Sequence, residues 1–234
     1  MPIIVTSDLL INQLRRESQA IAESFDALCD EDLHEISLLY SQAAAILLGA
    51  LNSQKPMSNA QSWAVEVLIN ISNSLAAAVY VLRAGFTLVP GTVLRNAIEA
   101  MAVCLHGLQY PAELDKIRSG EFNTPHAVTT AKKVIPPFGQ MYGMLSNLFT
   151  HISPLHQKIK PLAPYTERHL GLDMNLKTIR ASVWFFYVVV EFTFIGSLGE
   201  SARYWKWESP NIGRYDPSAE ERAWLVTYLG PISE

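Results

Sequence analysis

Apolar residues recur every three or four positions along most of the chain, which is the spacing that gathers side chains on one face of an α-helix. A first helix is predicted from its cap, Ser7, to about Leu28. A second is predicted to begin in the acidic turn 30–32 and to end at Lys55 and Pro56. Further segments share this periodicity: 59–84, 92–109, 112–118, 124–135 and 138–152. No strand pattern competes with this helical spacing, so no strand is predicted.

Prolines and glycines delimit the rest of the chain. Three prolines mark an irregular connection over 153–172, which is long for a compact domain and is our candidate for a lid or a partner-binding loop. A last helix is predicted to start at Asp216 and Pro217 and to end at Gly230.

The most apolar predicted helix spans 177–205, and Glu191 divides its apolar part into uncharged runs of ten and eight residues. A membrane-spanning helix needs roughly 20 apolar residues, and a carboxylate near the bilayer centre costs about 2.5–3.5 kcal/mol. We therefore predict a core helix and no membrane partner. Because a buried carboxylate needs a partner or takes up a proton, we expect Glu191 to face Arg, His, Tyr or a metal ion.

Composition favours one soluble all-α domain. Hydrophobic residues make up 49% of the 234 residues and charged residues 17%, whereas about a quarter is usually charged. Since no linker divides the chain, we predict a single domain, 1–234, built as a bundle of about seven or eight helices. A subunit interface added to a large core would account for the apolar excess, so we expect a homo-oligomer.

Charge and cysteine content limit which partners and which cellular compartment are expected for this protein. A net charge of −4 gives no general attraction to nucleic acid, and the only locally basic segment, 156–169, is interpreted as a solvated loop. Cys29 and Cys104 cannot build a disulfide framework, and Cys104 is predicted to be buried. The N-terminal residues lack the pattern of a signal peptide, so we expect a cytoplasmic protein.

The helix at 92–109 places Arg95, Glu99 and His106 on one face. One interpretation is an ion pair within the helix, with the histidine at its margin. The alternative is a polar pocket between helices, to which neighbouring helices contribute Glu66, Asn70 and Glu191.

A second polar group lies at 138–152. Tyr142 and Ser146 share a face of that helix, and His151 lies near its end, where a cation complements the helix dipole. No G-x-S-x-G motif is present, so no catalytic residue is assigned. The candidate pocket comprises Arg95, Glu99, His106, Tyr142, Ser146, His151 and Glu191.

Metal binding has one weak signal. Glu31 and His34 have the spacing of a di-iron ligand pair, but no second pair accompanies them, so solvated surface is the favoured interpretation. Neither H-E-x-x-H nor C-x-x-C occurs, and Gly-rich phosphate loops are absent. We predict no metal and no cofactor.

The segments LRNAIEAMAVCLHGLQYPAELDKIRSGE and YGMLSNLFTH together resemble a group of uncharacterised helical bacterial proteins. In that group an R-x-x-x-E helix precedes a helix with Tyr, Ser and His, and the serine-to-histidine spacing is shorter than here. The resemblance covers about the middle quarter of the chain and implies corresponding positions at Arg95, Glu99, Tyr142, Ser146 and His151.

The group is distantly similar to HEPN-type bundles, which include toxin and phage-defence ribonucleases with an R-x(4 to 6)-H motif. The nearest approach to that motif is Arg118 and His126, with seven intervening residues that include a Gly/Asn/Pro loop. Because the catalytic motifs considered are absent, the sequence favours a non-catalytic binding or interaction protein with a small-molecule or protein partner. A HEPN-like ribonuclease and a metal-binding bundle are the alternatives.

Overall fold

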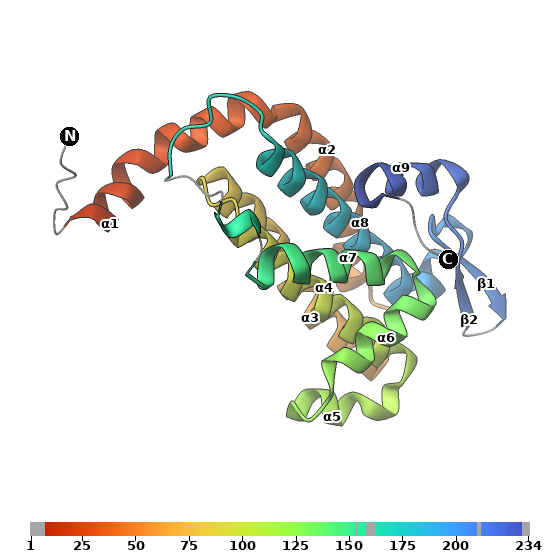
Figure 1. Ribbon diagram of the computed structural model, residues 1–234. Helices are drawn as coiled ribbons and strands as arrows, with labels where there is room; N and C mark the ends of the chain where they lie inside the picture. The colour runs from red at the N-terminus through yellow and green to blue at the C-terminus, as the bar shows by residue number, and fades with distance from the viewer. Residues whose placement is uncertain (1–7, 153, 158–161, 210–211, 231–234) are drawn as a thin grey trace, which may run out of the picture.

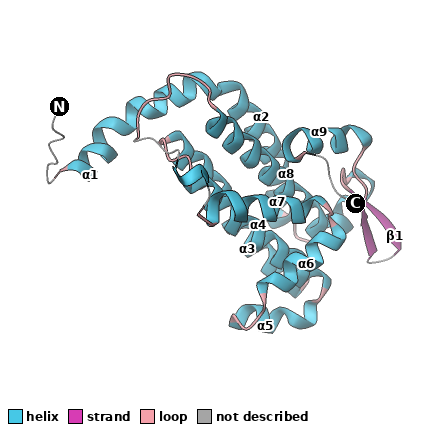
Figure 2. Ribbon diagram, viewed as in Figure 1, coloured by secondary structure: helices cyan, strands magenta, loops and turns pink. Residues whose placement is uncertain are grey.

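The computed structural model describes residues 8–152, 154–157, 162–209 and 212–230, and most of them are helical (Figure 2). The chain is mainly α-helical, as predicted. The α-helices of the described residues number nine rather than seven or eight: α1 (Leu9–Asn12), α2 (Ser18–Asn52), α3 (Asn59–Arg83), α4 (Val89–Gln109), α5 (Leu114–Ser119), α6 (Thr124–Val134), α7 (Pro137–Leu145), α8 (Leu170–Leu198) and α9 (Ala219–Leu229).

Shorter elements connect these helices. Two are π-helical turns: η1 (Gln13–Glu17) and η3 (Ser146–Thr150). Three are 3-10 turns: η2 (Pro111–Glu113), η4 (Pro154–Gln157) and η5 (Gly199–Ser201). Strands β1 (Trp205–Ser209) and β2 (Ile212–Tyr215) form one antiparallel hairpin.

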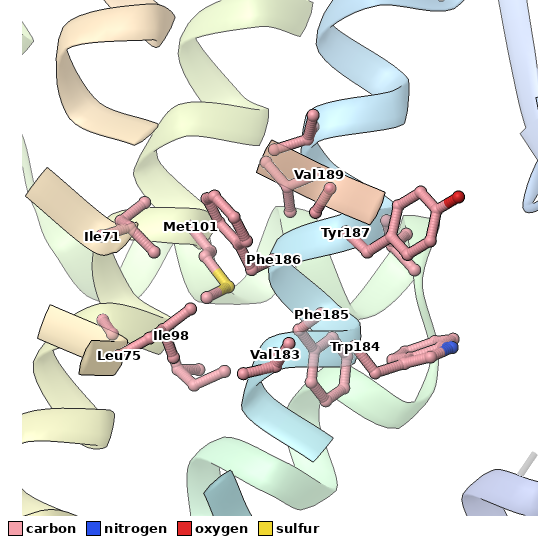
Figure 3. Packing of buried hydrophobic residues seen from close by; sticks show 14 of the residues in the cluster. Ile71, Leu75, Ile98, Met101, Val183, Trp184, Phe185, Phe186, Tyr187 and Val189 are labelled. Atoms are coloured by element: carbon pink, nitrogen blue, oxygen red, sulfur yellow. The ribbon is translucent and has the colours of Figure 1, made fainter. Parts of the chain in front are cut away.

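Helix α8 is the central helix, and α2, α3 and α4 pack against it (Figure 1). Its side chains are buried on several sides, because Trp184 and Tyr187 point away from the side on which Val183 and Phe186 lie (Figure 3). On the side of Val183 and Phe186, α3 contributes Ile71 and Leu75, and α4 contributes Ile98 and Met101 (Figure 3). This arrangement is what an all-round apolar helix predicts.

Three helical segments are long and apolar enough to cross a membrane by length and composition: Ser18–Asn52, Asn59–Arg83 and Leu170–Ser201. Of the most apolar window in Leu170–Ser201, 72% is buried inside the fold, as expected for a core helix. The corresponding fractions are 33% for Asn59–Arg83 and 17% for Ser18–Asn52, so a smaller share of these two helices is buried inside the fold.

Helix α2 corrects the prediction that a break near residue 30 separates two helices. It is a single helix of 35 residues, and η1 joins it directly to α1. The acidic residues do not end it because Asp32 forms ion pairs with Arg168 and Arg180, while the buried face continues through Cys29 and Ile36. A charge that is neutralised by partners from elsewhere in the fold does not mark a helix end.

The hairpin corrects two further predictions, that no strands occur and that the apolar helix reaches residue 205. Helix α8 ends at Leu198, where Gly199 adopts a φ of 56°, a conformation that favours glycine. The chain then folds back, and the Trp205 indole donates a 2.8 Å hydrogen bond to the Val188 carbonyl of α8. Tertiary contacts therefore override the local helical pattern here.

The irregular connection predicted at 153–172 contains η4 and ends where α8 begins, at Leu170. In its described part, the Tyr165 hydroxyl donates a 2.7 Å hydrogen bond to the Leu82 carbonyl, and Arg168 pairs with Asp32. Lys158 and Lys160 of the basic segment lie outside the described residues. The described part of this connection is thus bound to α2 and α3.

Candidate functional site

Four of the seven predicted site residues meet between α4 and the α7–η3 segment. Arg95 donates hydrogen bonds to the Ser146 hydroxyl, at 2.9 Å, and to the Tyr142 hydroxyl. It also pairs with Glu99 one helical turn away, and Tyr142 donates a 3.1 Å hydrogen bond to the Glu99 carboxylate. Arg95, Glu99, Tyr142 and Ser146 are called the arginine network below. The ion pair within α4 therefore extends into a cluster between helices.

The arginine network is half-buried and internally paired. The Arg95 and Glu99 side chains are 17% and 25% exposed. Burial and the neighbouring Glu99 carboxylate raise the pKa of Tyr142, while Arg95 opposes that rise. The Tyr142 hydroxyl therefore stays protonated at neutral pH and remains a hydrogen-bond donor.

The π-turn η3 begins at Ser146, and His151 follows its last residue. The His151 N–H donates a 3.0 Å hydrogen bond to the Ser146 carbonyl, five residues earlier, which is the hydrogen bond of a π-helix. Against this turn, a β-carbon added at Gly91 of α4 would lie 2.0 Å from the Phe149 ring, so only glycine allows η3 to pack this closely.

The His151 side chain is exposed. Within the described parts of the chain no hydrogen bond or ion pair joins it to the arginine network, so its place in the pocket stays a prediction.

His106 was also predicted for the pocket, but it belongs to a separate cluster. Its ring is 1% exposed, with Nδ1 at 3.2 Å from the Thr130 hydroxyl and Nε2 at 3.1 Å from the Glu113 carboxylate. The rings of Phe122 and His126 pack against it. These partners come from η2, α6 and the segment before α6, so His106 links those elements to α4.

Glu191 likewise does not join the arginine network. Its side chain is buried and accepts hydrogen bonds of 2.8 Å from the backbone N–H groups of Arg203 and Tyr204. Burial raises the pKa of Glu191, and these two hydrogen bonds act against the rise. The expected arginine, histidine, tyrosine or metal partner is thus replaced by the backbone that leads into β1.

Two further predicted contributors to the pocket, Glu66 and Asn70, are exposed on α3 and contribute nothing to it. Glu31 and His34 are exposed too, as a solvated surface requires, and His34 pairs with Asp30. Among the described residues no group of three or more His, Cys, Asp or Glu side chains could hold a metal ion.

A cleft lies where residues of the α6–α7 junction, the hairpin and α9 meet. Figure 1 shows the ribbons of these elements at one end of the molecule. We call this cleft the hairpin cleft, and its volume is about 850 Å³, within the range that small-molecule sites occupy. Its lining residues come from α4, α6, α7, the hairpin and α9: Gln109, Lys133, Val134, Pro136, Pro137, Glu208, Gly213, Arg214, Tyr215, Pro217, Arg222, Leu225 and Val226.

A capping box positions the α9 wall of this cleft. The Ser218 hydroxyl accepts a 3.2 Å hydrogen bond from the Glu221 N–H, and the Glu221 carboxylate accepts one of 2.8 Å from the Ser218 N–H. Glu221 also pairs with Arg203, which lies between α8 and β1. The start of α9 is thereby tied to the base of the hairpin, and the two elements form one wall.

One buried polar atom at the cleft has no hydrogen-bond partner among the described residues. The Tyr215 hydroxyl is buried and makes no hydrogen bond within the described part of the chain, although its ring lines the cleft. Burial raises the pKa of Tyr215, so the hydroxyl is protonated and can donate. An unsatisfied buried polar group is uncommon in a folded protein and is a reason to consider a ligand or a bound water.

Sequence reasoning missed the hairpin cleft. The cleft depends on the hairpin, which the helical pattern before residue 205 concealed. The available signal was the run 203–216, in which aromatic residues alternate with basic and acidic ones, a strand-like pattern that precedes the capped helix. No protein-family model, curated protein or solved structure matches this chain, so the proposals below rest on its own residues.

Proposed function

We propose that this protein is a non-catalytic ligand-binding protein, organised as a single bundle domain, and that the hairpin cleft is its ligand site. The observation that carries the proposal is the combination of a cleft of about 850 Å³ with a buried hydroxyl, that of Tyr215, which no described residue satisfies. Apolar walls with a few polar groups are the usual composition of small-molecule sites.

The pairing of the arginine network supports a structural role for it. Arg95 pairs with Glu99 and donates hydrogen bonds to both Ser146 and Tyr142. A nucleophile or base for catalysis must be able to reach substrate, whereas these groups are already engaged with one another. We therefore assign the network to holding α7 and η3 against α4.

Binding of the neutral fluorescent probe N-phenyl-1-naphthylamine tests the ligand site. Val226 lines the cleft on α9, and Val226→Trp would fill part of it, whereas Thr227→Trp adds the same ring at the next, exposed position outside the lining. We expect one probe per chain in the wild type and in Thr227→Trp, and at least tenfold weaker binding in Val226→Trp. Absence of binding, or equal binding in all three proteins, would refute the site.

A HEPN-like ribonuclease is the second candidate, and η3 is the observation that favours it. The π-turn accommodates the four residues between Ser146 and His151, which would compensate for the longer spacing relative to the group that this chain resembles. This candidate predicts RNA cleavage that His151→Ala and Arg95→Ala each abolish. Cleavage that persists in both variants would exclude this site.

We also propose a cytoplasmic homo-oligomer that uses α2. Leu38 and Leu48 of this helix are 63% and 56% exposed, and its most apolar window is the least buried of the three long apolar helical segments. A second copy of the chain would cover both leucines. Light scattering should give a dimer or larger species for the wild type and a monomer for Leu38→Glu/Leu48→Glu, and a concentration-independent wild-type monomer would exclude the interface.

A further inference from the structure

The walls of the hairpin cleft are apolar, while its charged residues are mostly basic. Three cationic side chains, Lys133, Arg214 and Arg222, line it together with one carboxylate, Glu208. The formal charge of these lining groups is therefore +3 − 1 = +2 at neutral pH. The whole chain carries −4, so the cleft has the opposite sign to the protein around it. A local reversal of charge in a concave site attracts anions.

The cations differ in how far they are already paired. Arg214 pairs with Glu208 at 2.8 Å and lies 3.8 Å from Asp216, and Arg222 lies 3.3 Å from Asp216. Asp216 is also neutralised by Lys206 at 2.7 Å. Lys133, at the end of α6 across the cleft, is exposed and has no ion-pair partner among the residues described. The cleft thus offers an ammonium group that no described acidic residue pairs with, opposite two guanidinium groups.

The apolar part of the lining is continuous with these cations. Val134 follows Lys133 directly in the chain and Pro136 and Pro137 come two residues later, while Leu225 and Val226 follow Arg222 on α9. Each wall of the cleft therefore carries a charged end and an apolar body. A ligand that contacts both the charged end and the apolar body of these walls must itself have a charged end and an apolar body.

We infer that the hairpin cleft binds an amphipathic organic anion, with its acidic head group between Lys133 and Arg214 and its apolar body against the α6–α7 junction and α9. This inference rests on the proposed ligand site and adds the chemical class of the ligand. Charge-assisted hydrogen bonds to the head group provide the preference for an anion, and burial of the apolar body provides most of the affinity.

Two probes of matched shape separate charge from apolar binding. 8-Anilinonaphthalene-1-sulfonate is an anion, and N-phenyl-1-naphthylamine has the same ring system without the charge. We expect the wild type to bind the anion about tenfold more tightly at low salt, the ratio that the loss of one charge-assisted hydrogen bond produces. Raising the salt from about 20 to 200 mM should reduce that preference, because exposed charges are screened.

Variants then locate the charge. Lys133→Gln/Arg214→Gln should weaken binding of the anion about tenfold and change binding of the neutral probe less than twofold. Glu208→Gln should tighten binding of the anion, since it removes the only carboxylate among the lining residues. Lys116→Gln, an exposed cation on α5 outside the cleft lining, is the matched control and should change neither affinity.

The outcomes distinguish the two proposals. If the neutral probe binds and Val226→Trp blocks it, but the anion has no advantage or keeps it in Lys133→Gln/Arg214→Gln, the ligand class is wrong and the ligand site stands. If neither probe binds, both proposals fail. Displacement of the bound anion by decanoate rather than decyl phosphate, or the reverse, would identify the head group as a carboxylate or a phosphate.

Discussion

The carboxylate of Glu191 accepts a hydrogen bond of 2.8 Å from the backbone N–H of Tyr204, thirteen residues further along the chain. A second oxygen of the same carboxylate accepts from the N–H of Arg203. Glu191 thus holds the chain at the point where it turns back from α8 into β1. A buried acid in the middle of an apolar helix, which by itself suggests a chemical site, here fixes the path of the backbone.

Removal of the Glu191 carboxylate should therefore reduce stability. Glu191→Ala leaves two N–H groups without their acceptor, and we expect a loss of about 2–4 kcal/mol in the free energy of unfolding. Glu191→Gln keeps one acceptor oxygen and should lose about 1 kcal/mol. Denaturant unfolding measures both losses, and the difference between them gives the contribution of the acceptor oxygen that glutamine retains. Equal stability of Glu191→Ala and the wild type would mean that these hydrogen bonds do not hold the hairpin.

Asp32 should make the protein sensitive to acid. Burial opposes ionisation of Asp32, but hydrogen bonds from Arg168 and Arg180 outweigh burial and lower its pKa below the ordinary 3.8. A carboxyl group with a lowered pKa in the folded state contributes stability above about pH 4 and loses it as the pH falls through the folded pKa. The urea concentration at the midpoint of unfolding should decrease as the pH is lowered below about 4. In Asp32→Asn this decrease should be smaller.

Asp32→Asn also has a consequence at neutral pH. The Arg180 side chain is 7% exposed and would keep Glu35, at 2.8 Å, as its remaining acidic partner. We expect a loss of about 2 kcal/mol at pH 7, less than the cost of leaving a buried charge entirely unpaired. If the stability of this variant fell between pH 5 and pH 2 as steeply as that of the wild type, other carboxylates would control the acid response.

Gly91 and Gly143 form a matched pair that tests how closely η3 packs on α4. A methyl group at Gly91 would lie 2.0 Å from the Phe149 ring, whereas nothing lies within 4 Å of the corresponding position at Gly143. Gly91→Ala should cost about 1–3 kcal/mol or more, because overpacking displaces the π-turn. Gly143→Ala, in helix α7, should instead gain about 0.5 kcal/mol. Thermal unfolding of both variants distinguishes a close contact from a general effect of alanine.

Tyr142→Phe tests whether the arginine network is independent of the hairpin cleft. The variant removes the hydroxyl that accepts from Arg95 and donates to Glu99, but keeps the ring, over which the Arg95 guanidinium lies at 4.1 Å. We expect about 1 kcal/mol of lost stability and no change in binding of N-phenyl-1-naphthylamine. Weaker probe binding in a folded variant would show that the network and the cleft are coupled.

Much of the helical framework is determined locally and could be predicted from the sequence. Helix α3 begins at a capping box formed by Ser58 and Gln61, and it ends close to Gly85, which adopts a φ of 94°. Both signals act within a few residues, so they are visible without the fold. The apolar residues around Glu191 likewise indicated a core helix, because a helix that is apolar on all sides must be surrounded.

The pairing of polar groups was decided only by the tertiary structure. Arg95 and Tyr142 are 47 positions apart and meet because α4 and α7 pack together, whereas His106, on the same helix as Arg95, is drawn to Thr130 and Glu113. The hairpin forms in place of further helix because Trp205 and Glu191 make hydrogen bonds that only the folded core offers. Local spacing determines which face of a helix a side chain occupies, and packing determines what that face meets.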